Sequence, residues 1–328
     1  MTEKQKNLRL FVPVYAIFFV IYLVACIIEP TFFTWENNVN LFTRITPLII
    51  VGIAQTLVIL TGGIDLSLGA SIGLANVIAA SLPFVNSPAN IALWLLVPPL
   101  VGLGVGLVNG LIITRGGFPP LIVTLAAGAI WKGVSLFVLP EPGGEVSRGV
   151  AGALTGTLFN FVPVPLVILL VVVFLFQIVL RRTQFGRSVY AVGGNETIAI
   201  ESGIAVDRVK IGVYALSGML GGVAGMFLSG WMNSGDPLVG EPYILNSIAV
   251  AVIGGTSLSG GTGGVVGIIG GAYIFHLLNN ILNLLAVSTF YQYVAKGLIL
   301  IAALAVTSTG AGIRLGSIFR KRREAESG

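Results

Sequence analysis

Asp65 has the most unusual setting of any acidic residue in the sequence, because it lies between two closely spaced apolar runs. It belongs to segment 61–69, which reads TGGIDLSLG. If the two runs cross a membrane, a carboxylate between them marks a structural or functional requirement. Two interpretations remain open. Either Asp65 or Ser67 caps a following helix by accepting its first N–H groups, or Asp65 shapes a broken helix beside a transport pathway.

Other polar side chains occur inside or beside apolar stretches. One group recurs at helical spacing, which places most of its members on one helix face. Within a membrane, such groups either bond neighbouring helices or line a polar pathway. Two lysines near the ends of apolar runs either extend to the membrane surface or line a pathway. With Asp65, the pathway or gate candidates are Asn76, Asn109, Lys132, His276, Asn279, Asn280, Asn283 and Lys296.

The longest polar segment, 181–210, contains the signals of a short helix. It offers an asparagine N-cap, a glutamate in the first turn, a glycine C-cap and apolar residues between them. Because a helix of about seven residues is marginal alone in water, the segment is either a solvated connector or a docking helix for a cytosolic partner. The residues concerned are Asn195, Glu196, Ile198, Ala199, Ile200 and Gly203.

Motifs for catalysis are absent from the sequence. It has no G-x-x-x-x-G-K-[ST] phosphate loop, no H-E-x-x-H and no G-x-S-x-G. Cys26 is the only cysteine and His276 the only histidine, so neither a disulfide nor a Cys- or His-based metal site is expected. Acidic residues inside apolar runs are scarce, which argues against an ion-coupled carrier. We therefore expect no catalytic residue, metal or cofactor in this chain.

The composition indicates which elements must position these residues. Of 328 residues, 55% are hydrophobic and 9% are charged, whereas soluble chains carry about 25% charged residues. This argues against a soluble enzyme, a disordered protein and a nucleic-acid binder. We predict an all-α polytopic membrane protein with one transmembrane domain over residues 1–328. About ten helices of about 20 residues are expected at 10–29, 46–60, 66–82, 90–114, 118–139, 162–180, 211–232, 244–256, 264–286 and 290–307.

Two of these expected spans, 46–60 and 244–256, are short and run into Gly-Gly, which predicts discontinuous helices. The positions of the basic residues predict that both termini are cytosolic, because Lys and Arg concentrate on that side. With this orientation only Arg44 and Arg148 lie outside. The cytosolic ones are Lys4, Lys6, Arg9, Arg115, Arg181, Arg182, Arg187, Arg208, Lys210, Arg314, Arg320, Lys321, Arg322 and Arg323.

Glycines recur every four residues within two of the expected spans, at 102, 106 and 110 and at 263, 267 and 271. This spacing predicts close helix packing within the chain, or alternatively a dimer interface or a mobile gate. A second pattern is an echo between segments 62–67 (GGIDLS) and 254–259 (GGTSLS), offset by 192 residues. The echo is either a repeat, as transporters often carry, or a coincidence.

Several segments, together with TGGIDLS, resemble those of a known family. They are FGRSVYAVGGN at 185–195, VIGGTSLSGG at 252–261, LNNILNLL at 278–285 and YQYVAK at 291–296. Over nearly its whole length the chain resembles the permease subunits of bacterial ABC importers of the ribose/xylose/galactose type, within the wider group of branched-chain amino acid permeases. Two departures are Lys132-Gly133, where Arg-Gly is expected, and Gln55, where relatives usually carry Met.

The resemblance implies a non-enzymatic subunit that forms the path for a monosaccharide through the bacterial plasma (inner) membrane. It also implies a second permease copy or paralogue, a cytosolic ABC ATPase that binds ATP and Mg²⁺, and a periplasmic or surface-tethered sugar-binding protein. Residues 181–210 would hold the coupling helix. The alternatives are an ABC permease for another small solute, such as a nucleoside, an autoinducer-type sugar or an amino acid, and a self-sufficient secondary carrier.

Overall fold

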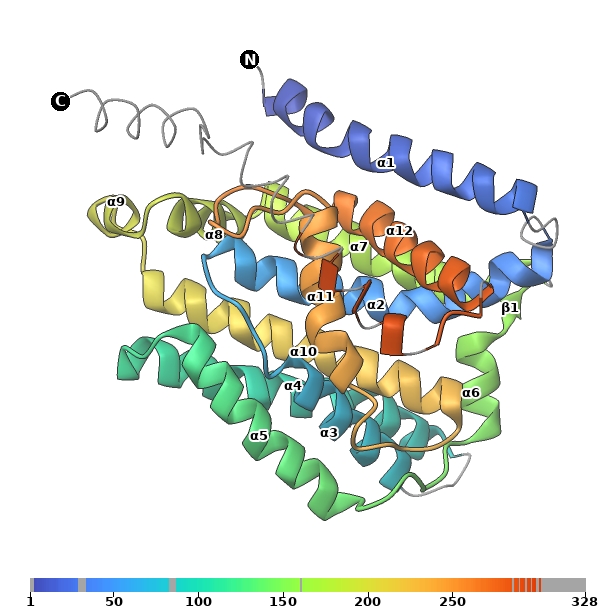
Figure 1. Cartoon of the computed structure of the whole chain (residues 1–328). Coiled ribbons are helices and arrows are strands. Elements are labelled where there is room, and N and C mark those ends of the chain that lie inside the picture. Colours follow the sequence, from blue (N-terminus) through green and yellow to red (C-terminus); the bar gives the residue numbers. More distant parts are fainter. Residues whose placement is uncertain are drawn as a thin grey trace. The chain divides into compact units, whose positions relative to one another are not determined.

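The chain is helical throughout most of its length in the computed structural model (Figure 1). The structure describes residues 3–28, 34–82, 87–159 and 161–284, together with 286–288, 290–292, 294, 295, 297, 298 and 301. The chain forms two compact units, Met1–Leu277 and Leu278–Gly328. The elements are α1 Glu3–Ile28, α2 Trp35–Leu60, α3 Leu68–Ser81, α4 Pro88–Gly116, α5 Pro120–Val138, α6 Arg148–Thr155, β1 Thr157–Leu158, β2 Val162–Pro163, α7 Val164–Arg182, α8 Gln184–Gly194, α9 Glu196–Glu201, α10 Val206–Met232, α11 Glu241–Ile253 and α12 Val265–Leu284.

Among the described residues, six helices are long and apolar enough to cross a membrane: α2, α4, α5, α7, α10 and α12. Helices α3 and α11 are apolar but have only 14 and 13 residues. At 1.5 Å per residue each is about 20 Å long, which is shorter than the roughly 30 Å hydrocarbon core of a bilayer. Nine of the ten expected spans coincide with a helix, and the last, 290–307, lies mostly outside the described residues.

Helix α2 differs from the short span expected at 46–60, because it begins at Trp35 and has 26 residues. The Thr34 side chain caps it by accepting the Asn37 N–H at 3.3 Å, and Glu36 stands in the first turn. These are the ordinary signals of a helix start. The expectation of a short span here was wrong. Arg44, expected outside the membrane, therefore lies within a helix long enough to cross it.

Helix α2 is also the centre of the core. Its residues from Ile45 to Leu60 are all buried, and it contacts α7, α10 and α11. The outer helices are different, because α5 and α7 expose large apolar side chains such as Phe137 and Phe174. A face of this kind suits contact with lipid tails better than contact with water.

Helix α10 lies between α2 and α4 (Figure 1). A Cβ on Gly102 would lie 2.1 Å from the Gly218 carbonyl oxygen, and one on Gly106 would lie 2.0 Å from the Tyr214 carbonyl oxygen. Likewise, a Cβ on Gly271 would lie 2.6 Å from the Val250 carbonyl oxygen. Both glycine stripes thus bring two backbones of the same chain together, which confirms the predicted helix packing.

Candidate functional site

Asp65 lies in the linker between α2 and α3 and is 1% exposed. Its Oδ1 accepts hydrogen bonds from the Ser67 N–H at 3.0 Å and the Ser67 hydroxyl at 2.6 Å. Its Oδ2 accepts one from the Ser217 hydroxyl of α10 at 3.1 Å. The capping role expected of Ser67 was wrong, because its side chain caps no N–H of α3. Asp65 instead holds the residue just before α3 and ties the linker to α10.

The rest of this linker is bonded to the surrounding helices. Asn109 of α4 donates from Nδ2 to the Ser67 hydroxyl oxygen at 2.7 Å. The Thr124 hydroxyl of α5 donates to the Ile64 carbonyl at 3.2 Å and accepts the Leu66 N–H at 3.1 Å. The Gln55 side-chain amide of α2, oriented so that its NH₂ faces the Asp65 carbonyl, donates to that carbonyl at 3.2 Å and accepts the Asp65 N–H at 3.3 Å. Four helices therefore hold one short linker.

Asn76 bonds two segments rather than facing an opening. Its Nδ2 donates to the Gly225 carbonyl of α10 at 3.2 Å, and its Oδ1 accepts the Asp236 N–H at 2.7 Å. Like Asn109, it is fully buried. Asn76 therefore joins α3 to α10, and Asn109 joins α4 to the linker before α3.

The linker begins where α2 ends in a glycine turn. The Gly62 N–H donates to the Ile59 carbonyl at 2.9 Å and the Gly63 N–H to the Val58 carbonyl at 3.1 Å. Gly62 has φ +81°. Helix α11 ends in the same way, with the Gly255 and Thr256 N–H groups bonded to Val252 and Ala251 and with φ +89° at Gly255. Both ends are Schellman motifs, in which glycine supplies the left-handed residue.

The polar segment 181–210 contains the predicted short helix as α9. The Asn195 side chain accepts the Ile198 N–H at 3.1 Å, which confirms the N-cap. Gly203 has φ +79° and ends the helix, since its N–H donates to the Ile200 carbonyl at 2.9 Å. Helix α8, which precedes α9, was not predicted, although Thr183 is an N-cap whose hydroxyl accepts the Gly186 N–H at 3.1 Å.

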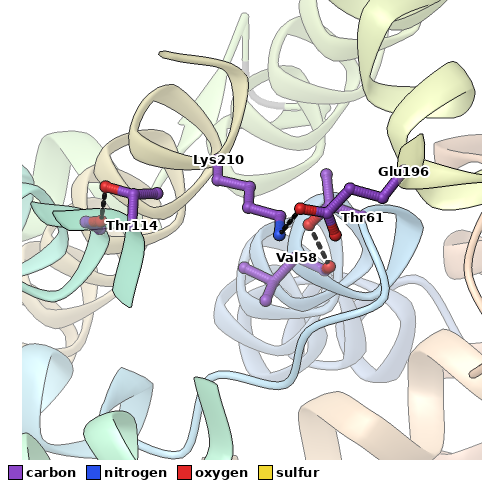
Figure 2. A network of polar contacts seen from close by, with 6 residues as sticks. Val58, Thr61, Thr114, Glu196 and Lys210 are labelled. Carbon is purple, nitrogen blue, oxygen red and sulfur yellow. Dashed lines mark hydrogen bonds and ion pairs between the residues drawn. The ribbon is translucent and has the colours of Figure 1, made fainter. Parts of the chain in front are cut away.

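The side chains of α9 divide between the body of the protein and the outside. Ala199 is buried, whereas Ile198 and Ile200 are each 58% exposed. Glu196 accepts a hydrogen bond from Lys210 of α10 at 2.7 Å. Figure 2 shows this ion pair, with the hydroxyl of Thr61 at the end of α2 directed at the Val58 carbonyl. The segment is therefore held to its own chain while two isoleucines remain exposed.

The α8–α9 corner meets the two glycine turns. The Gly261 N–H donates to the Leu60 carbonyl at 3.0 Å, which joins the turn after α11 to the end of α2. Gly193, near the end of α8, packs against both of these residues. The Tyr190 hydroxyl of α8 donates to the Gly263 carbonyl at 2.9 Å. Three segments far apart in the sequence therefore meet at one place.

The remaining candidates lie elsewhere. Lys132 of α5 forms an ion pair with Glu241 at the start of α11, and both side chains are about half exposed. The Arg44 guanidinium lies 6.0 Å from the ring centroid of Trp231, and His276 is half-buried in α12. Asn279 and Asn280 are half-buried in α12. The Asn283 side chain and Lys296 lie outside the described residues.

Comparisons with known proteins match most of the chain. A family model described as "Branched-chain amino acid transport system / permease component" covers residues 37–304. The chain is 38% identical over 289 residues to the ribose import permease protein RbsC of Bacillus subtilis (strain 168), covering 87% of this chain and 89% of the relative. It is 33% identical over 313 residues to the galactose/methyl galactoside import permease protein MglC of Escherichia coli (strain K12), covering 90% and 93%. No solved structure matches at a significant level.

Proposed function

We propose that this chain, which belongs to the branched-chain amino acid transport system / permease component family, is the transmembrane permease subunit of an ATP-driven ABC importer of monosaccharides. The observation that carries the proposal is the match, over most of both chains, to permeases named for ribose, galactose and allose. The chain is a multi-pass membrane protein, since six of its helices are long and apolar enough to cross a membrane.

Reconstitution tests this proposal. The permease is purified with the ATPase and the sugar-binding protein that accompany it and is placed in liposomes with radiolabelled ribose, xylose, galactose, an amino acid and a nucleoside. We expect uptake of one sugar that requires ATP and the binding protein. Uptake by the permease alone down an ion gradient would identify a secondary carrier. Uptake of only the amino acid or the nucleoside would show that the substrate is not a monosaccharide.

The partner ATPase, which would bind ATP and Mg²⁺, is proposed to dock on α9. Two exposed isoleucines on a cytosolic helix are an apolar surface that a partner can bury, while Ala199 anchors the helix to the permease. The test replaces Ile198 and Ile200 with Asp. We expect the ATPase to be lost from the purified complex, because two charges would enter the buried interface.

A matched control places the same two charges away from the cytosolic face. Leu158 and Phe161, in the β1–β2 hairpin, are also exposed and are changed to Asp together. The ATPase should remain bound in this control. Retention of the ATPase by the Ile198 and Ile200 double variant would show that the docking surface lies elsewhere.

The sugar path is proposed to follow the polar side of α12. A guanidinium is costly against lipid, yet Arg44 of α2 is exposed beside Trp231, which suits a face open to water. Single cysteines at 44, 276, 280 and 283 in a Cys26→Ser background test this path. Water-soluble thiol reagents should reach these positions in at least one nucleotide state, and the sugar should slow them. A set of positions that no reagent reaches would make these residues packing contacts.

The orientation in the bacterial plasma (inner) membrane, with about ten spans and both termini cytosolic, is also a proposal. Support comes from the basic residues, which cluster in 181–210 and near the two termini. Reporter fusions at Ser327 and within 140–160 should report opposite sides of the membrane. Reports from the same side would contradict the topology.

A further inference from the structure

At Gly193, the corner between α8 and α9 packs against main-chain atoms of two other segments. A Cβ built on Gly193 would lie 1.7 Å from the Leu60 carbonyl oxygen at the end of α2 and 2.6 Å from the Gly261 N of the turn after α11. Those two atoms belong to residues that are hydrogen-bonded to each other, with the Gly261 N–H donating to the Leu60 carbonyl at 3.0 Å. Gly193 therefore packs directly against the hydrogen bond that joins the end of α2 to Gly261 in the loop after α11.

The opposing turn is built to allow this approach. Gly260 and Gly261 have φ +81° and +68°, which favour glycine. A Cβ on Gly260 would lie 2.9 Å from the Gly193 carbonyl oxygen and 3.1 Å from the Gly62 N. Side-chain rotation can relieve contacts between side chains, but it cannot relieve contacts between backbones. A displacement of the α8–α9 corner must therefore move the end of α2 and the Gly260–Gly261 turn with it or break the contact.

We propose that Gly193 is the positioning residue through which movement of the cytosolic segment reaches the inner end of α2 and the loop between α11 and α12. This inference rests on the proposed function, in which an ATPase moves α9. The covalent route, through the flanking helices α7 and α10, remains, but it is indirect because α8 and the residues between α9 and α10 lie in between. The route through Gly193 is a direct contact with α2, whose residues from Ile45 to Leu60 are all buried.

The consequence for transport comes from α2 itself. It is one continuous helix of 26 residues, about 39 Å long at 1.5 Å per residue, with Leu60 as its last residue and Arg44 in its first half. A push at Leu60 is transmitted along the hydrogen-bonded turns from Leu60 back to Leu48. Pro47, which has no N–H to donate, is the point at which α2 can bend before Arg44. The Gly193 contact thus links the ATPase side to the proposed sugar path without passing through a side chain.

The test compares Gly193→Ala with Gly194→Ala in the full reconstituted complex. The two glycines are neighbours, but a Cβ on Gly194 would meet nothing within 4 Å. We expect Gly193→Ala to keep the ATPase bound and hydrolysing ATP while sugar moved per ATP falls about tenfold or more, since a misplacement of about 1 Å can have effects of this size. Gly194→Ala should transport at the wild-type ratio.

A milder variant keeps the proposal testable if Gly193→Ala does not fold. Tyr190→Phe removes only the hydroxyl that bonds Gly263 and leaves its ring beside Arg181. We expect a smaller fall in sugar moved per ATP, again with ATP hydrolysis retained. A wild-type ratio in Tyr190→Phe together with a wild-type ratio or misfolding of Gly193→Ala would overturn the proposal. So would an equal fall in Gly194→Ala, or loss of the ATPase from folded Gly193→Ala.

The wild-type complex, measured in the same experiment, distinguishes failure of the proposed function from failure of the coupling role of Gly193. If the wild-type complex binds no ATPase or moves no sugar with ATP, the proposed function fails. If the wild-type complex transports and the Gly193 variants transport equally well per ATP, only the coupling role fails.

Discussion

The two glycine turns, after α2 and after α11, end their helices with the same backbone motif but are held in different ways. The first leads into a linker that contains Asp65 and is bonded by side chains of four helices. The second contains no charged residue, and its bonds are mainly between backbone groups, such as Ser257 N–H to Thr262 carbonyl at 3.0 Å. One turn is fixed by a polar network, and the other depends on close backbone packing.

The comparison also shows what the sequence echo represents. Matching letters at an offset of 192 pairs Gly62 with Gly254, but the left-handed residues are Gly62 and Gly255, which are 193 apart. The shared feature is therefore the way in which the helix ends, displaced by one residue from the shared letters. A Gly-Gly pair can end a helix in either register, because each of its two glycines can adopt the left-handed conformation that the residue after the helix needs.

The largest expected effect is on the polar network of the first turn. Asp65→Leu removes three hydrogen-bond acceptor contacts and leaves buried groups of Ser67 and Ser217 unpaired, at a cost of about 3 kcal/mol or more. Asp65→Asn keeps an oxygen for Ser67 and should be clearly milder. The melting temperature of the purified permease and its transport rate measure this difference.

The matching position of the second turn provides the control. Ser257 stands where the sequence echo would place Asp65, and its hydroxyl accepts the N–H of the exposed Ser259 at 3.3 Å. Ser257→Ala should change the melting temperature little. Complete loss of transport in both Asp65 variants at normal expression would show instead that the negative charge itself is required.

The next largest effect is expected at Gly63, the second glycine of the turn after α2. A Cβ on Gly63 would lie 2.5 Å from the Tyr214 hydroxyl, which is buried without a hydrogen-bond partner among the described residues. Gly63→Ala should therefore destabilise the permease by about 1–3 kcal/mol through overpacking. Tyr214→Phe removes the opposing oxygen and should restore most of this loss.

Two further variants complete this cycle. Tyr214→Phe alone should leave the melting temperature unchanged or raise it, because no hydrogen bond is lost. Gly62→Ala meets no atom within 4 Å and suffers only from its positive φ, so Tyr214→Phe should not rescue it. Rescue of Gly62→Ala, or none of Gly63→Ala, would contradict the assigned geometry.

The smallest expected effect concerns the ion pair between Glu196 of α9 and Lys210 of α10. Lys210→Ala removes the bond to Glu196, in which both groups are partly exposed. Such pairs contribute at most about 1 kcal/mol, and salt weakens them. We expect sugar transport per ATP to remain close to wild type, measured beside Gly193→Ala. An equally large loss in Lys210→Ala would mean that the segment acts on α10 as strongly as on α2.

Much of this protein could be predicted from its sequence, because the relevant signals are local or compositional. Long apolar runs locate membrane helices, since a buried backbone must bond to itself, and α4, α5, α7 and α10 lie where expected. The caps of α9 were predicted for the same reason, because Asn195 and Gly203 act within one turn of the chain. The resemblance to sugar permeases came from segments of consecutive residues and was confirmed by the family match together with the ribose and galactose permeases that the chain resembles.

The tertiary structure alone decided which polar residues meet. Asn76 and Asn109 are alike in sequence context, yet one bonds a loop beyond α10 and the other bonds Ser67. The approach of Gly193 to Leu60 joins positions more than 130 residues apart, and no local pattern encodes a distance between two backbones. Local preference determines where a helix starts and stops, whereas the place at which helix ends meet depends on how every helix between them packs.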